Sequence, residues 1–427
     1  MHQRRKMSRS RTSNPIRQFL RKLWPGLITG AADDDPSGIA TYSVAGAQQG
    51  TALLWTALLT WPLMGCVQMM CARIGMVTGQ GLAATLRLKF PKWLIAVATF
   101  ALFAANTVNI AADLAGMADA AEMLTGLGAR WYVPLFGLGI TAASIWYRYE
   151  QISRILKWLA LSLLAYVVTG VIIRPAWSEV LWNTVAPTWP KGHEMWSTLV
   201  AILGTTISPY LFYWQSSLEV EEEKAGGHRK LADRRGATLP QLSDRRVDVA
   251  TGTFASNFVM YFIILTTGLT LHQAGITQIE TSRQAAEALR PLAGNLASTL
   301  FTLGVVGTGF LAIPTLAGSA AYAFAETFAW RQGLDQRLLR ARGFYVVFIV
   351  SMTIAVILNY MNVSSIKALY WSAVLNGLLA PFLLVGILII ACNSSIMRGQ
   401  PSSMTSRVVV GIAIVVMFGA LVGMFAF

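Results

Sequence analysis

Three consecutive carboxylates interrupt an apolar stretch near the start of the chain. The stretch covers residues 26–50, GLITGAADDDPSGIATYSVAGAQQG, and carries Asp33, Asp34 and Asp35 in its middle. A carboxylate at the centre of a bilayer costs about 2.5–3.5 kcal/mol on the lenient insertion scale, so three in a row need a polar partner or a cation. The pattern predicts a cation site inside the membrane. The alternative is a short loop outside it, which the apolar flanks on both sides disfavour.

The residues that follow these acids predict a break in the helix. Pro36 removes a backbone donor and disfavours helical geometry at Asp35, and Gly38 lets the chain turn. A break at mid-membrane depth frees backbone carbonyl groups, and this is tolerated only where they line a buried or wet cavity. The first apolar segment is therefore expected to be two half-helices that meet at the acids.

A second break is expected in the sixth apolar segment. Residues 204–217, GTTISPYLFYWQSS, place Pro209 directly after a small and hydroxyl-rich patch. Taken alone, this is equally a proline kink satisfied by threonine hydroxyls. Broken segments in the first and sixth positions together predict two five-helix halves related by inverted topology, with the substrate site where the breaks face each other.

The composition is that of a polytopic membrane protein. The 427 residues are 55% hydrophobic and 13% charged, with a mean hydropathy of +0.53, which excludes a large soluble domain. No P-loop or Rossmann fingerprint occurs, so we expect neither ATP-driven pumping nor a cofactor. Eleven apolar segments predict transmembrane helices near residues 24–50, 51–76, 94–124, 132–147, 153–173, 196–218, 248–271, 293–328, 341–359, 364–391 and 408–427.

The distribution of basic residues predicts the orientation. With the amino terminus in the cytoplasm, 28 of the 34 Lys and Arg fall on the cytoplasmic side. This explains the net charge of +14 without a nucleic-acid partner. The predicted organisation is a basic cytoplasmic arm (1–23), a ten-helix core (24–391) with a cytoplasmic loop (219–247), and an eleventh helix (408–427) that ends outside. The expected location is a bacterial inner membrane.

Four motifs in the same order resemble those of a known family. They are PGLITGAADDDPSGIAT (25–41), VQMMCARIGMVTGQGLA (67–83), NIAADLAG (109–116) and GTTISPYLFYWQSS (204–217). They are similar to the first, second, third and sixth helices of the Nramp family, the natural resistance-associated macrophage protein type of divalent metal transporter. The resemblance implies an all-α membrane protein with the fold of the bacterial leucine transporter, a 5+5 inverted repeat with broken helices 1 and 6.

The metal-binding motifs depart from the family pattern. Where the family has Asp-Pro-Gly-Asn, this chain keeps the metal-binding Asp as Asp35 but has Gly38 in place of the Asn ligand. Where the family has Met-Pro-His, Ser208 replaces the thioether and Tyr210 the His. The family's tenth-helix Gln corresponds to an alanine here, with Asn376 one turn further on.

The groups that carry protons in the family are also depleted. Asp113 matches the family's proton-pathway Asp, but its acidic partners correspond to Asn106 and Gly116. The later His of the sixth helix is Gln215. We therefore expect weak or absent proton coupling, with Asp113 as the possible proton pathway. An inward potential of 100 mV contributes about 2.3 kcal/mol per charge, which drives a divalent ion without a proton.

These departures favour a hard divalent ion as substrate. Carboxylate, hydroxyl, carbonyl and water suit Mg²⁺ and Mn²⁺, whereas a thioether suits softer ions. Mg²⁺ usually keeps several waters, and the loss of side chains at Gly38 and Ser208 leaves space for them. The resemblance is to the Nramp-related magnesium transporters, and proton-coupled Mn²⁺ or Fe²⁺ symport is the close alternative.

The predicted site has an inner and an outer group of residues. Asp35 is expected to be the principal charged ligand, and Asp33 and Asp34 either face an aqueous vestibule or make structural bonds to neighbouring helices. The predicted metal residues are Asp35, Gly38, Thr205 and Ser208, and the predicted surrounding residues are Asp33, Asp34, Tyr210, Gln215 and Asn376.

Other classes of protein remain as alternatives. A carrier of a small organic cation or amino acid is disfavoured because three acids beside the break oppose an anionic group. A non-transporting membrane sensor would depend on the cytoplasmic loop rather than on Asp35. An enzyme is the least favoured reading, since no nucleophile, base and orienting group recur at workable spacing. The expected partners are the metal substrate and membrane lipids, with no obligate protein partner.

Overall fold

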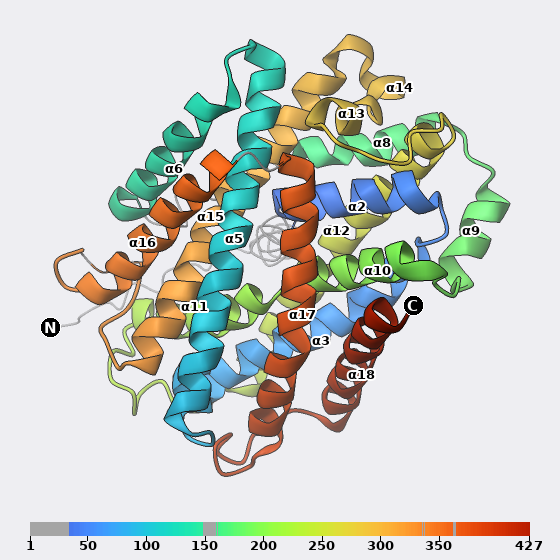
Figure 1. The fold of residues 1–427 in the computed structure, drawn as a ribbon. Helices are drawn as coiled ribbons and strands as arrows, with labels where there is room; N and C mark the ends of the chain where they lie inside the picture. Colours follow the sequence, from blue (N-terminus) through green and yellow to red (C-terminus); the bar gives the residue numbers. More distant parts are fainter. Residues whose placement is uncertain (1–33, 148–158, 160, 335, 337, 362–363) are drawn as a thin grey trace, which may run out of the picture.

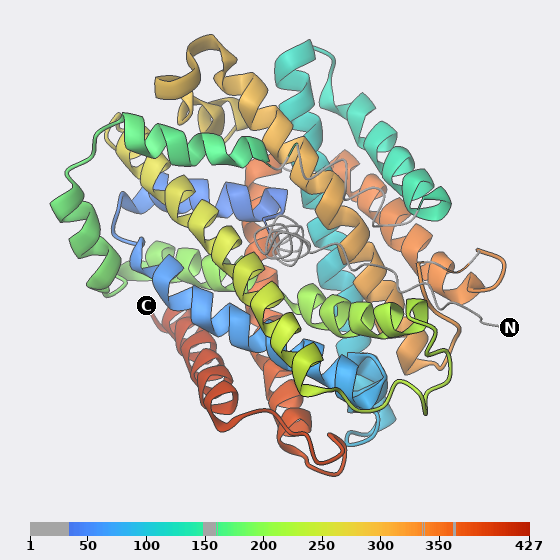
Figure 2. The same cartoon turned by 180° about the vertical axis from the view of Figure 1, so that it is seen from behind.

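The protein is a bundle of long helices that pack side by side (Figures 1 and 2). The computed structural model describes residues 34–147, 159, 161–334, 336, 338–361 and 364–427, and these contain no β-strand. The predicted basic arm (1–23) and Asp33 lie outside the described residues. The all-helical prediction is confirmed.

The described helices begin directly after the predicted first break. Up to the second break they are α2 (Pro36–Gln49), α3 (Trp55–Thr78), α4 (Leu82–Leu86), α5 (Lys92–Thr125), α6 (Ala129–Trp146), η1 (Leu161–Leu163), α8 (Leu164–Ile172), α9 (Trp177–Val185) and α10 (Gly192–Thr206). After the second break they are α11 (Pro209–Ala225), α12 (Leu239–Thr267), the π-helical turn η2 (Gly268–His272), α13 (Ser282–Glu287), α14 (Arg290–Ala293), η3 (Gly294–Leu296), α15 (Ala297–Thr327), α16 (Arg342–Leu358), η4 (Asn359–Met361), α17 (Ser365–Cys392) and α18 (Met404–Ala426).

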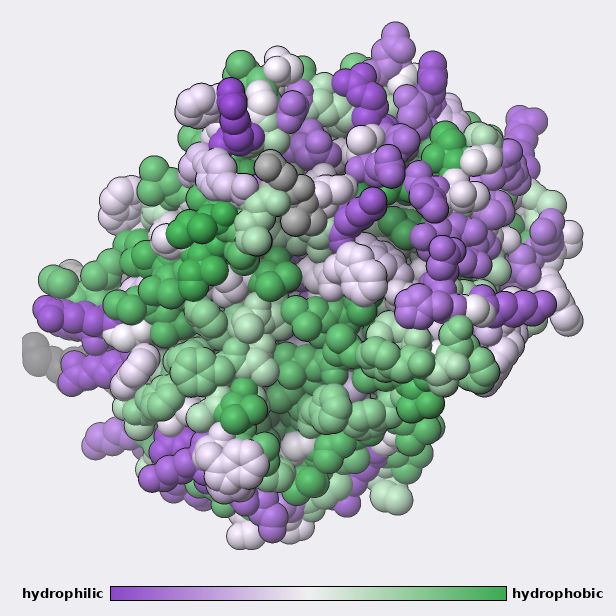
Figure 3. All heavy atoms as spheres, in the orientation of Figure 1, coloured by the Kyte–Doolittle hydropathy of each residue, from purple (hydrophilic) through white to green (hydrophobic). Residues whose placement is uncertain are grey.

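The described residues contain 8 helical spans that are long and apolar enough to cross a membrane. They correspond to eight of the eleven predicted segments, with α10 and α11 counted as one broken span. The other three predicted segments, 24–50, 132–147 and 153–173, contain α2, α6 and α8. Figure 3 shows a broad hydrophobic zone across one face of the molecule with hydrophilic residues gathered on either side of it. Such a surface suits an integral membrane protein.

Helix α2 and the broken segment formed by α10 and α11 lie in the interior of the bundle. Helix α2 packs against α10, α12 and α17, and α5 packs against α15, α16 and α17. Close approach of α10 to α17 depends on Gly204, since a Cβ there would lie 2.1 Å from the carbonyl oxygen of Ala373. The fold therefore places α2, α5, α10 and α17 around one buried region.

The last helix, α18, packs on α3, α10 and α17. Its carboxyl end is joined to the start of α10, because Nδ1 of His193 lies 2.9 Å from the carbonyl oxygen of Met424. The fit is tight at Gly423, where a Cβ would lie 2.4 Å from the Trp196 ring. The predicted eleventh segment is thus a helix packed on the broken segment.

The polar stretch 219–247, predicted as a cytoplasmic loop, is helical at both ends. Helix α11 continues to Ala225, and α12 begins at Leu239 behind a capping box formed by Thr238 and Gln241. This capping box satisfies backbone donors at the start of α12, which fixes where the helix begins. The non-helical connection is therefore shorter than the 219–247 loop of the sequence analysis.

Candidate metal-binding site

Asp35 lies at the amino end of α2, where its carboxylate caps the helix. Its Oδ1 accepts hydrogen bonds from the backbone N–H of Gly38 and from Oγ of Ser37, both at 2.7 Å. Asp35 is buried. A helix amino terminus favours negative charge, and Pro36 at its first position needs no donor of its own. The local sequence thus holds the carboxylate rigidly at the predicted break.

The other oxygen of Asp35 is bound to α5 through Asn109. Nδ2 of Asn109 donates to Oδ2 of Asp35 and to Oδ2 of Asp113, both at 3.1 Å. Oδ1 of Asn109 accepts from Nδ2 of Asn376 on α17 at 3.0 Å. One buried amide therefore connects two carboxylates and a second amide from three helices.

The second break is built from Ile207 and Ser208, which separate α10 from α11. Ser208 has an extended backbone (φ −77°, ψ 134°), and Pro209 begins α11. Oγ of Ser208 donates to the carbonyl oxygens of Gly204 at 2.8 Å and Thr205 at 2.7 Å. The serine hydroxyl thus satisfies carbonyl groups that the break would otherwise leave unpaired. The predicted second break is present.

The start of α2 faces the second break. A Cβ on Gly38 would lie 3.2 Å from Oγ1 of Thr205 and 3.4 Å from Oδ1 of Asp35. Within the described part of the chain, three buried oxygens close to this contact have no hydrogen-bond partner: Oγ1 of Thr205, Oδ1 of Asp113 and Oδ1 of Asn376. Buried polar atoms normally have partners. Hydroxyl, amide and carboxylate oxygens of this kind fit a hard divalent cation or the waters that it carries.

The remaining predicted residues lie at different distances from this contact. Oδ1 of Asp34 accepts from Oγ of Ser256 on α12 at 2.9 Å, which matches the structural-bond alternative and not the vestibule. Tyr210 is fully buried in the first turn of α11. Gln215 donates to Oε1 of Glu219 at 2.8 Å, and it lies about 10 Å along the helix from Ser208. Gln215 is therefore not beside Asp35.

Two site residues were not predicted from the sequence. Ser37 binds Asp35 directly, and Asn109 connects Asp35 to Asp113. The signal for Asn109 was its spacing, because it precedes Asp113 by four residues and so shares its helix face. Among the described residues, no group of three or more His, Cys, Asp or Glu could hold a metal. The candidate site therefore depends on amides and hydroxyls as well as on carboxylates.

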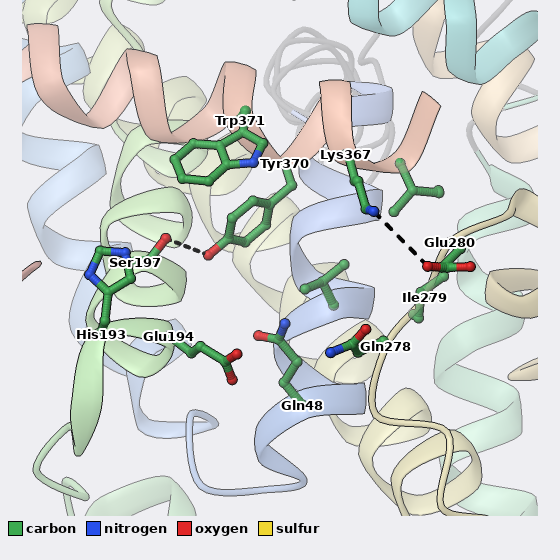
Figure 4. Close-up of a pocket in the computed structure, with 12 residues that line it drawn as sticks. Gln48, His193, Glu194, Ser197, Gln278, Ile279, Glu280, Lys367, Tyr370 and Trp371 are labelled. Carbon is green, nitrogen blue, oxygen red and sulfur yellow. Dashed lines mark hydrogen bonds and ion pairs between the residues drawn. The ribbon is translucent and has the colours of Figure 1, made fainter. Parts of the chain in front are cut away.

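A pocket of about 260 Å³ lies where α2 ends and where α10 and α17 begin. The predicted orientation places this end of the bundle outside the cell. The hydroxyl of Tyr370 lies 2.8 Å from Oγ of Ser197 (Figure 4). It also lies 3.2 Å from Oγ1 of Thr198, which donates to Oε1 of Gln48 at 3.0 Å. These bonds connect α17, α10 and α2 across the approach to the candidate site.

The hydrogen-bond chain at Tyr370 leads to a first prediction. Tyr370→Phe removes a hydroxyl that holds the outer ends of three helices together, and each such bond contributes about 0.5–1.5 kcal/mol. We expect the apparent KM for external Mn²⁺ to fall by roughly threefold to tenfold, because the outward-open form becomes more populated. Initial uptake rates in proteoliposomes give this KM, and Trp371→Phe in the same pocket is the control. An unchanged or higher KM in Tyr370→Phe would contradict the role.

A buried, oxygen-rich site between the start of α2 and the break that separates α10 from α11 is typical of a secondary transporter of the leucine-transporter fold. The chain belongs to the Nramp family, whose sequence profile, described as natural resistance-associated macrophage protein-like, matches residues 26–426. The predicted family is thereby confirmed, and it is a family of transporters rather than enzymes.

Known relatives agree with the family assignment, and solved structures share the fold. The chain is 30% identical over 352 residues to the divalent metal cation transporter MntH of Aeromonas hydrophila subsp. hydrophila, which covers 79% of this chain and 81% of that protein. The structure matches the Eremococcus coleocola manganese transporter with a TM-score of 0.71 at 17% identity, over 98% of this chain and 89% of that one. It also matches Mhp1, a nucleobase-cation-symport-1 family transporter, with a TM-score of 0.59 at 13% identity, over 94% and 91% of the two chains.

Proposed function

We propose that this protein carries a partly hydrated divalent metal cation, Mg²⁺ or Mn²⁺, into the cytoplasm by alternating access. The observation that carries the proposal is the contact between the start of α2 and the second break, where Asp35 lies beside Gly38 and Thr205. The curated relatives are named divalent metal cation transporters, which supports a divalent substrate. Asp35 supplies the charge, and the oxygens of Thr205 and Asn376 bind the ion or its waters.

The proposed preference for a hard ion rests on the chemistry of these donors. Ser208 stands where the resemblance places a thioether, and its hydroxyl is bound to two backbone carbonyls. Gly38 has no side chain to separate Asp35 from Thr205, whose oxygens would lie 3.4 Å and 3.2 Å from a Cβ there. Mg²⁺ gives up its water reluctantly. A site of one rigid carboxylate, neutral oxygens and retained waters therefore favours Mg²⁺ or Mn²⁺ over softer ions.

We propose that transport occurs with weak or no proton coupling. Gln215 cannot titrate, and it binds Glu219 rather than the metal-site residues. A second candidate, proton-coupled Mn²⁺ or Fe²⁺ symport, is favoured by one observation: Asn109 joins Asp113 to Asp35. In that case Asp113 would hold the transported proton. Recording internal pH during metal uptake distinguishes uncoupled transport from proton-coupled symport.

The test is uptake of Mg²⁺, Mn²⁺ and Cd²⁺ into proteoliposomes with internal pH recorded, for the intact protein and for Ser208→Met. We expect Mg²⁺ or Mn²⁺ to enter proteoliposomes that contain the intact protein without acidifying their interior. The added thioether should raise Cd²⁺ uptake relative to Mg²⁺ about tenfold, equivalent to about 1.4 kcal/mol. Acidification that depends on Asp113 would support the symporter. No flux of any metal would favour a membrane sensor.

A further inference from the structure

Polar side chains on α12 lead away from the candidate site toward the loop between α11 and α12. Ser256 binds Asp34, next to the proposed ligand Asp35. Asp248 lies eight residues before Ser256 and Arg245 eleven residues before it, so both lie on the same face of α12 as Ser256. The predicted orientation makes this the cytoplasmic side. Helix α12 thus carries polar groups from the metal site toward the cytoplasm.

Helix α11 presents a matching row. Gln215, Glu219 and Glu222 follow one another at spacings of four and three residues, so they share one face of α11. Gln215 donates to Glu219, which is buried. Both α11 and α12 pack on α3. The two rows therefore border the same region between the second break and the loop.

Arg245 joins the two rows. Its Nε lies 2.7 Å from Oε1 of Glu219, and its Nη1 lies 2.7 Å from Oδ2 of Asp248. Its Nη2 pairs with Oε2 of Glu222. The Arg245 side chain is only 13% exposed and that of Glu219 only 3%. One guanidinium therefore connects α11 to α12 at the end of the polar rows.

A cavity of about 550 Å³ lies at this cluster. Its lining includes Glu219, Glu222, Asp248 and Arg245 together with Asp244 and Glu223. Its excess of carboxylates attracts cations. Removing the guanidinium from the buried carboxylates of Glu219 and Asp248 is costly unless another positive charge replaces it. A metal ion that arrives from Asp35 supplies that charge.

We infer that Arg245 is the inner gate of the transport pathway, which closes the exit between α11 and α12 by pairing with Glu219, Glu222 and Asp248. This inference rests on the proposed function, since it assumes that an ion leaves Asp35 toward this end. When the gate opens, the three carboxylates are released from Arg245 and draw the departing cation into the cavity.

The test measures access to the metal site from the loop side. The reporter is Ser256→Cys in the full chain with Cys66, Cys71 and Cys392 replaced by alanine, labelled in inside-out vesicles with a membrane-impermeant thiol reagent. Arg245→Gln should increase the labelling rate at least tenfold. It should also raise the apparent KM for external Mn²⁺ in uptake, because the inward-open form becomes more populated.

Two matched variants accompany this test. Arg246→Gln removes the same charge from the neighbouring exposed position, and it should leave labelling unchanged. Arg245→Lys keeps the charge and should restore slow labelling. If Arg245→Gln does not fold, Glu219→Gln opens the same cluster and should also speed labelling.

The outcomes separate the gate from the proposed function. Equal labelling of Arg245→Gln, Arg246→Gln and the parent, with unchanged KM, would overturn the gate even if Mn²⁺ is transported. Faster labelling of Arg245→Gln alone, without metal uptake by any variant, would support the gate and reject the proposed substrate.

Discussion

Asp35→Asn is expected to reduce Mg²⁺ or Mn²⁺ uptake at least 100-fold. The change keeps the shape of the side chain but removes the charge that the proposed ion binds, and a loss of about 3 kcal/mol corresponds to this factor. The amide also replaces an acceptor with a donor where Ser37, Gly38 and Asn109 all donate. Initial uptake in proteoliposomes measures the loss of transport, and binding of Mn²⁺ to the purified protein measures the loss of affinity.

Asp34→Asn is the matched control for this prediction. Asp34 is the adjacent buried carboxylate, and it accepts a hydrogen bond from Ser256 on α12. We expect its replacement to lower thermal stability while Mn²⁺ binding to the purified protein persists. If Asp35→Asn transports as well as the parent, or if only Asp34→Asn loses Mn²⁺ binding, the site is misplaced and the metal-carrier mechanism fails.

Asn109→Leu is expected to weaken Mn²⁺ binding about 10–100-fold, the usual effect of losing a group that orients a metal ligand. Leucine has a similar size but cannot donate to Asp35 and Asp113 or accept from Asn376. Two buried carboxylates then lose their shared donor, and the ligand oxygen of Asp35 is no longer held in place. Equilibrium binding of Mn²⁺ to the purified protein gives the dissociation constant.

The control is Asn106→Leu, the same substitution one turn earlier on α5. Asn106 donates to the carbonyl oxygen of Leu316 and to Ser319, both at 2.8 Å, and so connects α5 to α15 instead of to the site. Asn106→Leu should lower the thermal stability and leave the dissociation constant unchanged. Similar loss of Mn²⁺ binding in both variants would show that Asn109 acts through the fold and does not orient Asp35.

The sequence predicted the helices and the second break because these depend on local physics. Apolar length defines a membrane helix, and α5, α15 and α17 begin and end within a few residues of the predicted segments. Proline decides where a helix begins, so Pro36 and Pro209 marked the starts of α2 and α11. The short helices α9 and α13 escaped prediction because helices of 9 and 6 residues have little periodicity to detect.

The site was only partly predictable because its contacts join distant parts of the chain. The motif around Asp35 indicated a charged ligand, but nothing local relates Asn109 to Asp35, 74 residues earlier. Ser208 stays a predicted metal ligand, and its hydroxyl also donates to two carbonyls of its own helix end, contacts that the motif did not indicate. Gln215 was predicted near the metal from its helix alone, and the direction of its side chain places it with Glu219.

The attachment of α18 to α10 has a practical consequence for studying the protein. His193 at the start of α10 is bonded to the backbone of Met424, close to the chain's last residue, Phe427. Any tilt of α10 that opens the outer pocket must either pull this end along or break the bond. A fluorophore attached behind Phe427 is therefore mechanically coupled to α10, and a bulky purification tag at the same position would load that helix and change the transport rate.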